Sequence, residues 1–142
     1  MSLSDCAGHL WSLSVEVFVR ITRIYSDSSG ETHFADEDLT FNAIDFAPPA
    51  PPLHVSDFVP ATRIGFVQEP TGWFGDAHPT PKRQYVLILS GTIQASVSDG
   101  DERTFPPGSV VLLEDTAGAG HRTSFIGTDD LCLALVQIPD ES

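Results

Sequence analysis

A chain of 142 residues has the length of one ordinary domain, and its 41% hydrophobic and 19% charged residues are typical of a globular protein. Seven Lys and Arg against twenty Asp and Glu give a formal charge of −13, which disfavours nucleic acid and anionic membrane surfaces as partners. No apolar run approaches the roughly 20 residues that span a bilayer, which disfavours a membrane span.

The first twenty residues contain an apolar stretch that resembles a signal peptide only superficially. It lacks a basic n-region, Glu16 interrupts it, and no small-residue cleavage site follows, so we expect a cytoplasmic protein. We expect residues 1–16 to form a tail or an edge segment and residues 17–142 to form one barrel domain. The two cysteines, Cys6 and Cys132, are too few for a disulfide framework.

Short stretches rich in Val, Ile, Leu, Phe and Thr alternate with turn signals such as Asp99-Gly100, and no stretch keeps a helical period over three turns. The pattern predicts an all-β protein. Nine strands are expected, near residues 17–25, 39–46, 63–68, 84–89, 92–98, 102–105, 109–114, 121–125 and 131–138. That many short strands in a small chain indicate a sandwich, a jelly roll or a barrel.

Two segments between these strands are interpreted as connections. The acidic run at 36–38 is expected to be a solvated loop or a strand edge. The proline-rich run at 48–52 cannot supply a central strand, because proline lacks a backbone N–H, so we expect a stiff crossing segment there.

The spacing of Gly72, His78, Thr80, Gln84 and Gly91 is the first pattern that indicates a specific site. The intervals between them are five, one, three and six residues. This register resembles the first motif of the cupin superfamily, which reads glycine, five residues, His-x-His, three or four residues, Glu, six residues, glycine. Thr80 stands at the second His of the motif, and Gln84 stands at the Glu.

The segment from Gly108 to Phe125 resembles the second cupin motif, which reads glycine, five residues, proline, x, glycine, two residues, His, three residues, Asn. Glu114 replaces the proline, two extra residues precede His121, and Phe125 replaces the Asn. The chain is thus similar to small single-domain cupins. This resemblance implies a double-stranded β-helix, or jelly-roll, barrel.

What the resemblance implies chemically is a divalent first-row metal near the barrel axis. His78 and His121 are its candidate ligands, and Gln84 is either a third ligand or a hydrogen-bonding wall of the pocket. One His and the only carboxylate of the motif are replaced, so we expect Zn, Fe, Mn or Ni to bind weakly or substoichiometrically. Asp76 is either a turn residue after Gly75 or a replacement for the lost carboxylate, since period two would place it on the face of His78.

Further residues are candidates for binding a small molecule. Trp73 and Tyr85 are candidates for an apolar wall, with plain core packing as the alternative. Thr80 and Gln84 are candidates for polar contacts. Arg83 is a candidate for attracting a carboxylate at the barrel mouth, with a solvated turn as the alternative.

These observations leave two functional hypotheses. The first is a small-molecule-binding cupin that acts as a metal-dependent enzyme of oxygenase, isomerase or decarboxylase type on a small carboxylated metabolite. The second is a non-catalytic ligand-binding or sensor cupin that has lost its metal. The sequence has no nucleophile elbow, phosphate-binding loop or dinucleotide fingerprint. We also expect a homodimer that pairs through sheet edges, with residues 15–19 covering or exchanging an edge.

Overall fold

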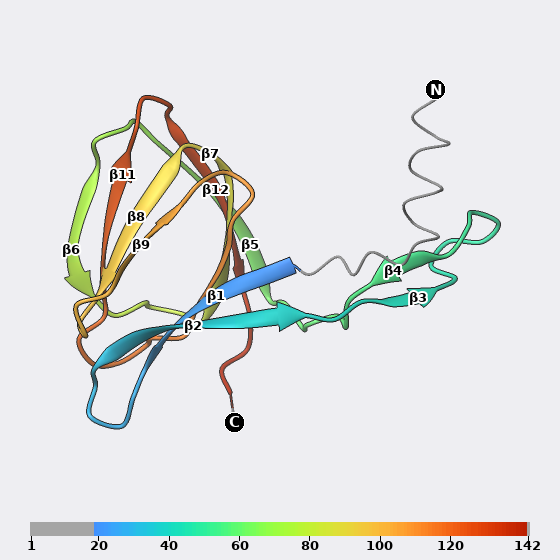
Figure 1. Cartoon of the computed structure of the whole chain (residues 1–142), viewed down its shortest axis with the longest axis horizontal. Helices are drawn as coiled ribbons and strands as arrows, with labels where there is room; N and C mark the ends of the chain where they lie inside the picture. Colours follow the sequence, from blue (N-terminus) through green and yellow to red (C-terminus); the bar gives the residue numbers. More distant parts are fainter. Residues whose placement is uncertain (1–18, 142) are drawn as a thin grey trace.

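The computed structural model describes residues 19–141, which form strands joined by turns and loops (Figure 1). Residues 1–16 and the first two positions of the predicted strand 17–25 lie outside the described residues. Among residues 19–141, none belongs to a helix of the length and apolarity needed to cross a membrane. The strands in the described part are β1 (Val19–Ser26), β2 (Thr32–Leu39), β3 (Asn42–Ile44), β4 (Leu53–Val55), β5 (Arg63–Glu69), β6 (Phe74–His78), β7 (Gln84–Ser90), β8 (Thr92–Val97), β9 (Glu102–Phe105), β10 (Val110–Leu113), β11 (His121–Ile126) and β12 (Leu131–Gln137).

Strands β5 to β12 pair as one long hairpin that is wound into a barrel. Counted inward from its ends, β5 pairs with β12, β6 with β11, β7 with β10 and β8 with β9, all antiparallel. Further ladders join β12 to β7 and β11 to β8, which gives the sheet orders β10-β7-β12-β5 and β6-β11-β8-β9. This pairing defines a double-stranded β-helix, so the predicted all-β jelly-roll barrel of the cupin type is confirmed.

The core lies between the two sheets because each strand turns alternate side chains inward. Val86 and Ile88 of β7 and Leu133 of β12 pack against Phe105 and Phe125 of the opposite sheet. The alternation that predicted these strands therefore also identifies the inner face of the barrel.

The β1–β2 hairpin extends the larger sheet, with β1 parallel to β10. His33 of this hairpin fastens it to the turn between β8 and β9. Its Nδ1 lies 2.7 Å from the Asp99 carboxylate and its Nε2 lies 2.7 Å from that of Asp27. The hydrogen bond to Asp27, followed by that to Asp99, raises the pKa of His33, and the bond to His33 is the main reason that the pKa of Asp27 falls well below its usual range.

Strands β2 and β6 were not predicted, and both are edge strands of their sheets. β2 contains the acidic run 36–38, so of the two expectations for this run the strand edge is correct. Arg103 lies 2.7 Å from Asp36, and Arg20 lies 2.9 Å from Asp38. An edge strand can be polar because it has only one neighbouring strand and need not bury a whole face.

The proline-rich run does not cross the barrel, so the expected crossing segment is wrong. It forms the loop at the tip of a two-stranded ribbon, β3 with β4, where the Ala50 N–H donates to the Ala47 carbonyl at 2.9 Å. The predicted strand 39–46 shrinks to β3, and β4 was not predicted. Figure 1 shows the ribbon standing away from the barrel.

Candidate ligand-binding cavity

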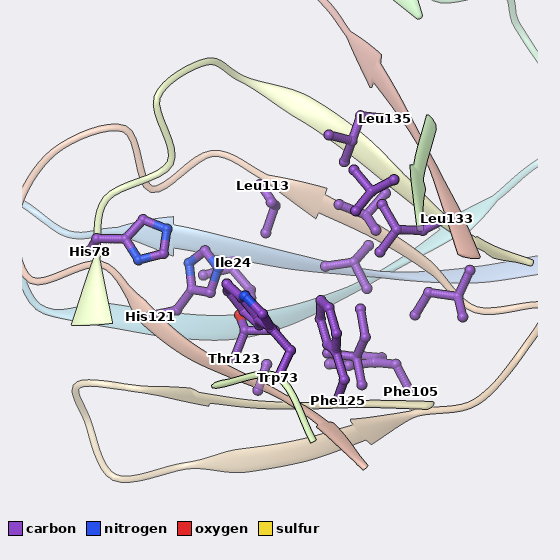
Figure 2. Close-up of a pocket in the computed structure, with 16 residues that line it drawn as sticks. Ile24, Trp73, His78, Phe105, Leu113, His121, Thr123, Phe125, Leu133 and Leu135 are labelled. Atoms are coloured by element: carbon purple, nitrogen blue, oxygen red, sulfur yellow. The ribbon is translucent and has the colours of Figure 1, made fainter. Parts of the chain in front are cut away.

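A cavity of about 240 Å³ lies inside the barrel between the two sheets. Apart from His78, His121 and Thr123, its wall consists of hydrophobic residues from strands of both sheets. Figure 2 shows the two imidazoles at one end of the cavity and Phe125 and Phe105 toward the other. The residues that line it are Ile24, Val67, Trp73, His78, Val86, Ile88, Ile93, Ala95, Phe105, Val111, Leu113, His121, Thr123, Phe125, Leu133 and Leu135.

The strand ladder between β6 and β11 brings the two histidines together. His78 is the last residue of β6, His121 is the first residue of β11, and the two are paired in the register. Their ring centroids are 5.7 Å apart. His78 is exposed and His121 is buried, so a ligand in the cavity would meet His78 at the solvent side.

Hydrogen bonds determine which nitrogen of each ring carries a proton. Nδ1 of His78 lies 2.7 Å from the backbone carbonyl of Asp76, and Nδ1 of His121 lies 2.7 Å from Oδ2 of Asp115. Carbonyl and carboxylate oxygens only accept, so both Nδ1 atoms donate. In the neutral rings, Nε2 is therefore the unprotonated nitrogen that can accept a hydrogen bond or ligate a metal.

Asp115 orients His121 and was not singled out from the sequence. Its side chain is fully buried, and its Oδ1 accepts a hydrogen bond of 2.8 Å from the hydroxyl of Thr80. The Thr80 N–H also donates to the Asp115 carbonyl at 2.9 Å. A buried carboxylate is stable only when its oxygens are hydrogen-bonded. No sequence motif marks this role, because it arises from contacts that form only in the folded chain.

Gly120 allows β6 and β11 to approach so closely. A Cβ atom at this position would overlap the backbone carbonyl group of His78, and the φ of Gly120 is +71°. The loop before β11 is also held by Thr32, whose hydroxyl donates a hydrogen bond to the Gly120 carbonyl at 2.7 Å. The absence of a side chain at Gly120 therefore lets the two histidines lie next to each other.

Of the other predicted site residues, only Trp73 lines the cavity. Its indole stacks on Phe125 with the ring centroids 4.7 Å apart. Its six-membered ring also covers Gly75, where a Cβ atom would lie 2.5 Å from the nearest indole carbon. Trp73 is 41% exposed, so it separates the cavity from solvent on this side.

Thr80 and Gln84 are buried but do not line the cavity. Thr80 is turned to Asp115 and is 2% exposed. Gln84 lies on the inward-facing side of β7 with Val86 and is 8% exposed, and its Oε1 has no hydrogen-bond partner. An unpaired buried acceptor is costly, so Gln84 is the one motif residue whose polar group remains unsatisfied in the described part of the chain.

Tyr85 and Arg83, for which core packing and a solvated turn were the alternatives to a binding role, lie outside the cavity. Tyr85 follows Gln84 on β7 and so faces the other side of the sheet, where it packs with Leu112. Arg83 lies 2.9 Å from Glu114 and 3.1 Å from Glu141. These carboxylates neutralise the guanidinium that was expected to attract a substrate.

The donor set does not fit a tightly held metal ion. Within residues 19–141 no group of three or more His, Cys, Asp or Glu side chains is placed to bind one. Asp76 contacts His78 through its backbone carbonyl, and its carboxylate does not line the cavity. The Asp115 carboxylate is already held by Thr80 and His121. Two imidazole nitrogens remain, which is fewer than the three protein ligands of an ordinary catalytic zinc site.

No protein-family model matches the chain, and no curated protein matches its sequence. Among solved structures, the cupin domain of Cnp3 from Schizosaccharomyces pombe is 13% identical, with a TM-score of 0.48 over 91% of this chain and 88% of that one. A putative ethanolamine utilization protein Q from Salmonella typhimurium is 15% identical, with a TM-score of 0.44 over 88% of this chain and 99% of that one. With sequence identities and TM-scores this low, neither similarity supports a conclusion about function.

The order of strand pairing, independent of these comparisons, makes the chain a cupin-type barrel. Its interior holds an apolar cavity with two histidines at one end.

The close approach at Gly120 can be tested against a glycine that has a positive φ but free space. Gly120→Ala should lower the free energy of unfolding by about 3 kcal/mol or more, because left-handed strain of about 1 to 2 kcal/mol adds to the clash with His78. Gly100→Ala, at a φ of +96° with no atom within 4 Å of the added Cβ, should cost only the strain. Urea unfolding measures both, and equal losses would contradict the close-approach account.

Proposed function

We propose that this chain binds a small molecule with an apolar, ring-sized body and one polar group, with the polar group facing His78 and His121. The observation that supports this is the position of the two imidazoles at one end of an otherwise apolar cavity of about 240 Å³. Ligand sites of this kind are apolar pockets with a few polar groups that fix orientation.

The imidazoles favour a carboxylate or hydroxyl as the polar group. A neutral ring accepts a hydrogen bond at Nε2 from a hydroxyl or a carboxylic acid, and a protonated ring donates one to a carboxylate. The small carboxylated metabolite expected from the sequence therefore remains the proposed class of ligand. The group that would recognise it is the histidine pair rather than Arg83, whose charge is already neutralised by Glu114.

A non-catalytic binding or sensor role is favoured over a metal-dependent enzyme. The donor set of two imidazoles lacks a carboxylate and a third nitrogen, so a divalent metal would be held weakly and exchange with solvent. If such an ion is bound, His78 and His121 would hold it, and it would supply a Lewis acid at the polar end of the cavity. The cytoplasmic location and the lack of nucleic-acid partners stay predictions from the sequence.

Trp73 provides a direct measure of binding, since it lines the cavity and the only other tryptophan, Trp11, can be replaced by Phe. In this Trp11→Phe background, benzoate and benzyl alcohol should change the fluorescence of Trp73 and bind more tightly than toluene. His121→Phe should weaken benzoate at least about tenfold, a loss of about 1.4 kcal/mol, while toluene changes little.

Tyr85→Phe is the matched control for this experiment, because Tyr85 was also a predicted site residue but lies on the outer side of the sheet. It should leave the affinity for benzoate unchanged. Failure of all three probes to bind, or benzoate affinity that is insensitive to His121→Phe, would show that the histidine end of the cavity does not recognise a polar group.

Elemental analysis of protein purified without chelator tests the weak metal site. We expect well under one equivalent of Zn, Fe, Mn and Ni combined, and His78→Ala or His121→Ala should remove what remains. Stoichiometric metal that survives both alanine substitutions would place the metal elsewhere in the protein.

A further inference from the structure

The outer face of the larger sheet is apolar over β5, β7 and β12, although this face points away from the barrel core. The inward positions of these strands include Val67, Val86 and Leu133, which line the cavity. The alternate positions therefore face outward, and in a sheet with one solvated face they should be polar. We define the outer face by the side chains of Ile64, Phe66, Leu87, Ala134 and Val136, together with Leu89 at the bulge where β7 and β12 lose register.

Part of the outer side of this sheet is covered within the chain, and part is not. Near β1 and β10 a second small core forms around Ile21, Leu112 and Ile138, and Tyr85 packs against it. Toward β5 this cover ends. Ile64 is 63% exposed and Phe66 is 69% exposed, although both lie on a regular strand.

The ribbon is a second uncovered apolar feature. We define it as residues 42–59, which comprise β3, β4, their loop and the segment that follows β4. β3 and β4 pair only with each other among the described strands, and Figure 1 shows them away from the barrel. Phe58 is 76% exposed and stacks on Phe46 with centroids 6.2 Å apart. An isolated two-stranded ribbon is marginally stable in water, so this one needs a surface to pack on.

The exposed apolar area matches what a stable dimer buries. Eight large apolar residues of the ribbon and the outer face are 40% to 76% exposed, namely Ile44, Phe46, Leu53, Phe58, Val59, Ile64, Phe66 and Leu89. At roughly 150 to 250 Å² for a fully exposed side chain of this size, they expose on the order of 850 Å² per chain. Two copies would bury about 1,700 Å², within the roughly 1,200 to 2,000 Å² of stable interfaces.

We propose that a second copy of this chain is the partner of both features, with the ribbon of each copy packed on the outer face of the other. The ribbon points away from its own barrel, so it is placed to reach another molecule rather than its own β5. A two-fold pair satisfies both surfaces at once, because each copy offers one ribbon and one outer face. This interface differs from the dimer expected from the sequence, which used residues 15–19, of which only Val19 lies in the described part of the chain.

Light scattering at micromolar concentration and physiological ionic strength tests the pair. The wild type should have twice the 15.3 kDa mass of the chain. Phe58→Asp in the ribbon and Phe66→Asp on the outer face should each weaken dimerisation at least about 30-fold, as expected for the loss of an interface hot spot. Phe74→Asp is the matched control, since Phe74 is 55% exposed but lies on β6 in the other sheet, and it should stay dimeric.

Mixing the two monomeric variants tests the reciprocal arrangement itself. The ribbon of Phe66→Asp and the outer face of Phe58→Asp are both intact, so the equimolar mixture should form heterodimers that neither variant forms alone. Circular dichroism of each variant should match the wild type. A monomeric wild type, dimers that persist in either single variant, loss of dimers in Phe74→Asp, or a mixture that stays monomeric would each overturn the proposal.

Discussion

The buried carboxylate of Asp115 is the interaction on which the site depends. It joins three parts of the chain that are distant in sequence: the loop before β7 through Thr80, the loop after β10 through Asp115 itself, and the start of β11 through His121. Because the carboxylate is fully buried, its two hydrogen-bond donors are needed to offset the loss of hydration. The same bonds hold the imidazole of His121 in one orientation and one tautomer.

This arrangement gives a physical reason for the altered first motif. At the position of the second motif histidine, Thr80 does not reach the cavity but completes the hydrogen bonding of Asp115. At the position of the motif carboxylate, Gln84 brings no charge into the interior. The change from a charged donor set to two imidazoles in an apolar wall favours recognition of an organic ligand over tight retention of an ion.

Local patterns were enough to predict much of the barrel. The central strands β7 and β12 could be predicted to within one or two residues. They bury one whole face, so the apolar residues of that face recur at every second position, and glycines mark the turns around them. The sequences of β2 and β6 do not alternate between apolar and polar residues, so the same pattern does not predict them. The motif spacing selects His78 and His121, and the structure brings their ring centroids to 5.7 Å from each other. The role of Asp115 could not be predicted, because its burial is produced by contacts with Thr80 and His121 that only the folded chain brings together.

The state of the His121 ring tests the central claim most directly. Nitrogen-resolved NMR of the histidine rings distinguishes a protonated Nδ1 from a protonated Nε2 in the neutral imidazole. The hydrogen bond from Nδ1 to Asp115 predicts that His121 carries its proton on Nδ1 and leaves Nε2 unprotonated toward a ligand. A neutral His121 with its proton on Nε2 would contradict the orientation on which the proposed recognition depends.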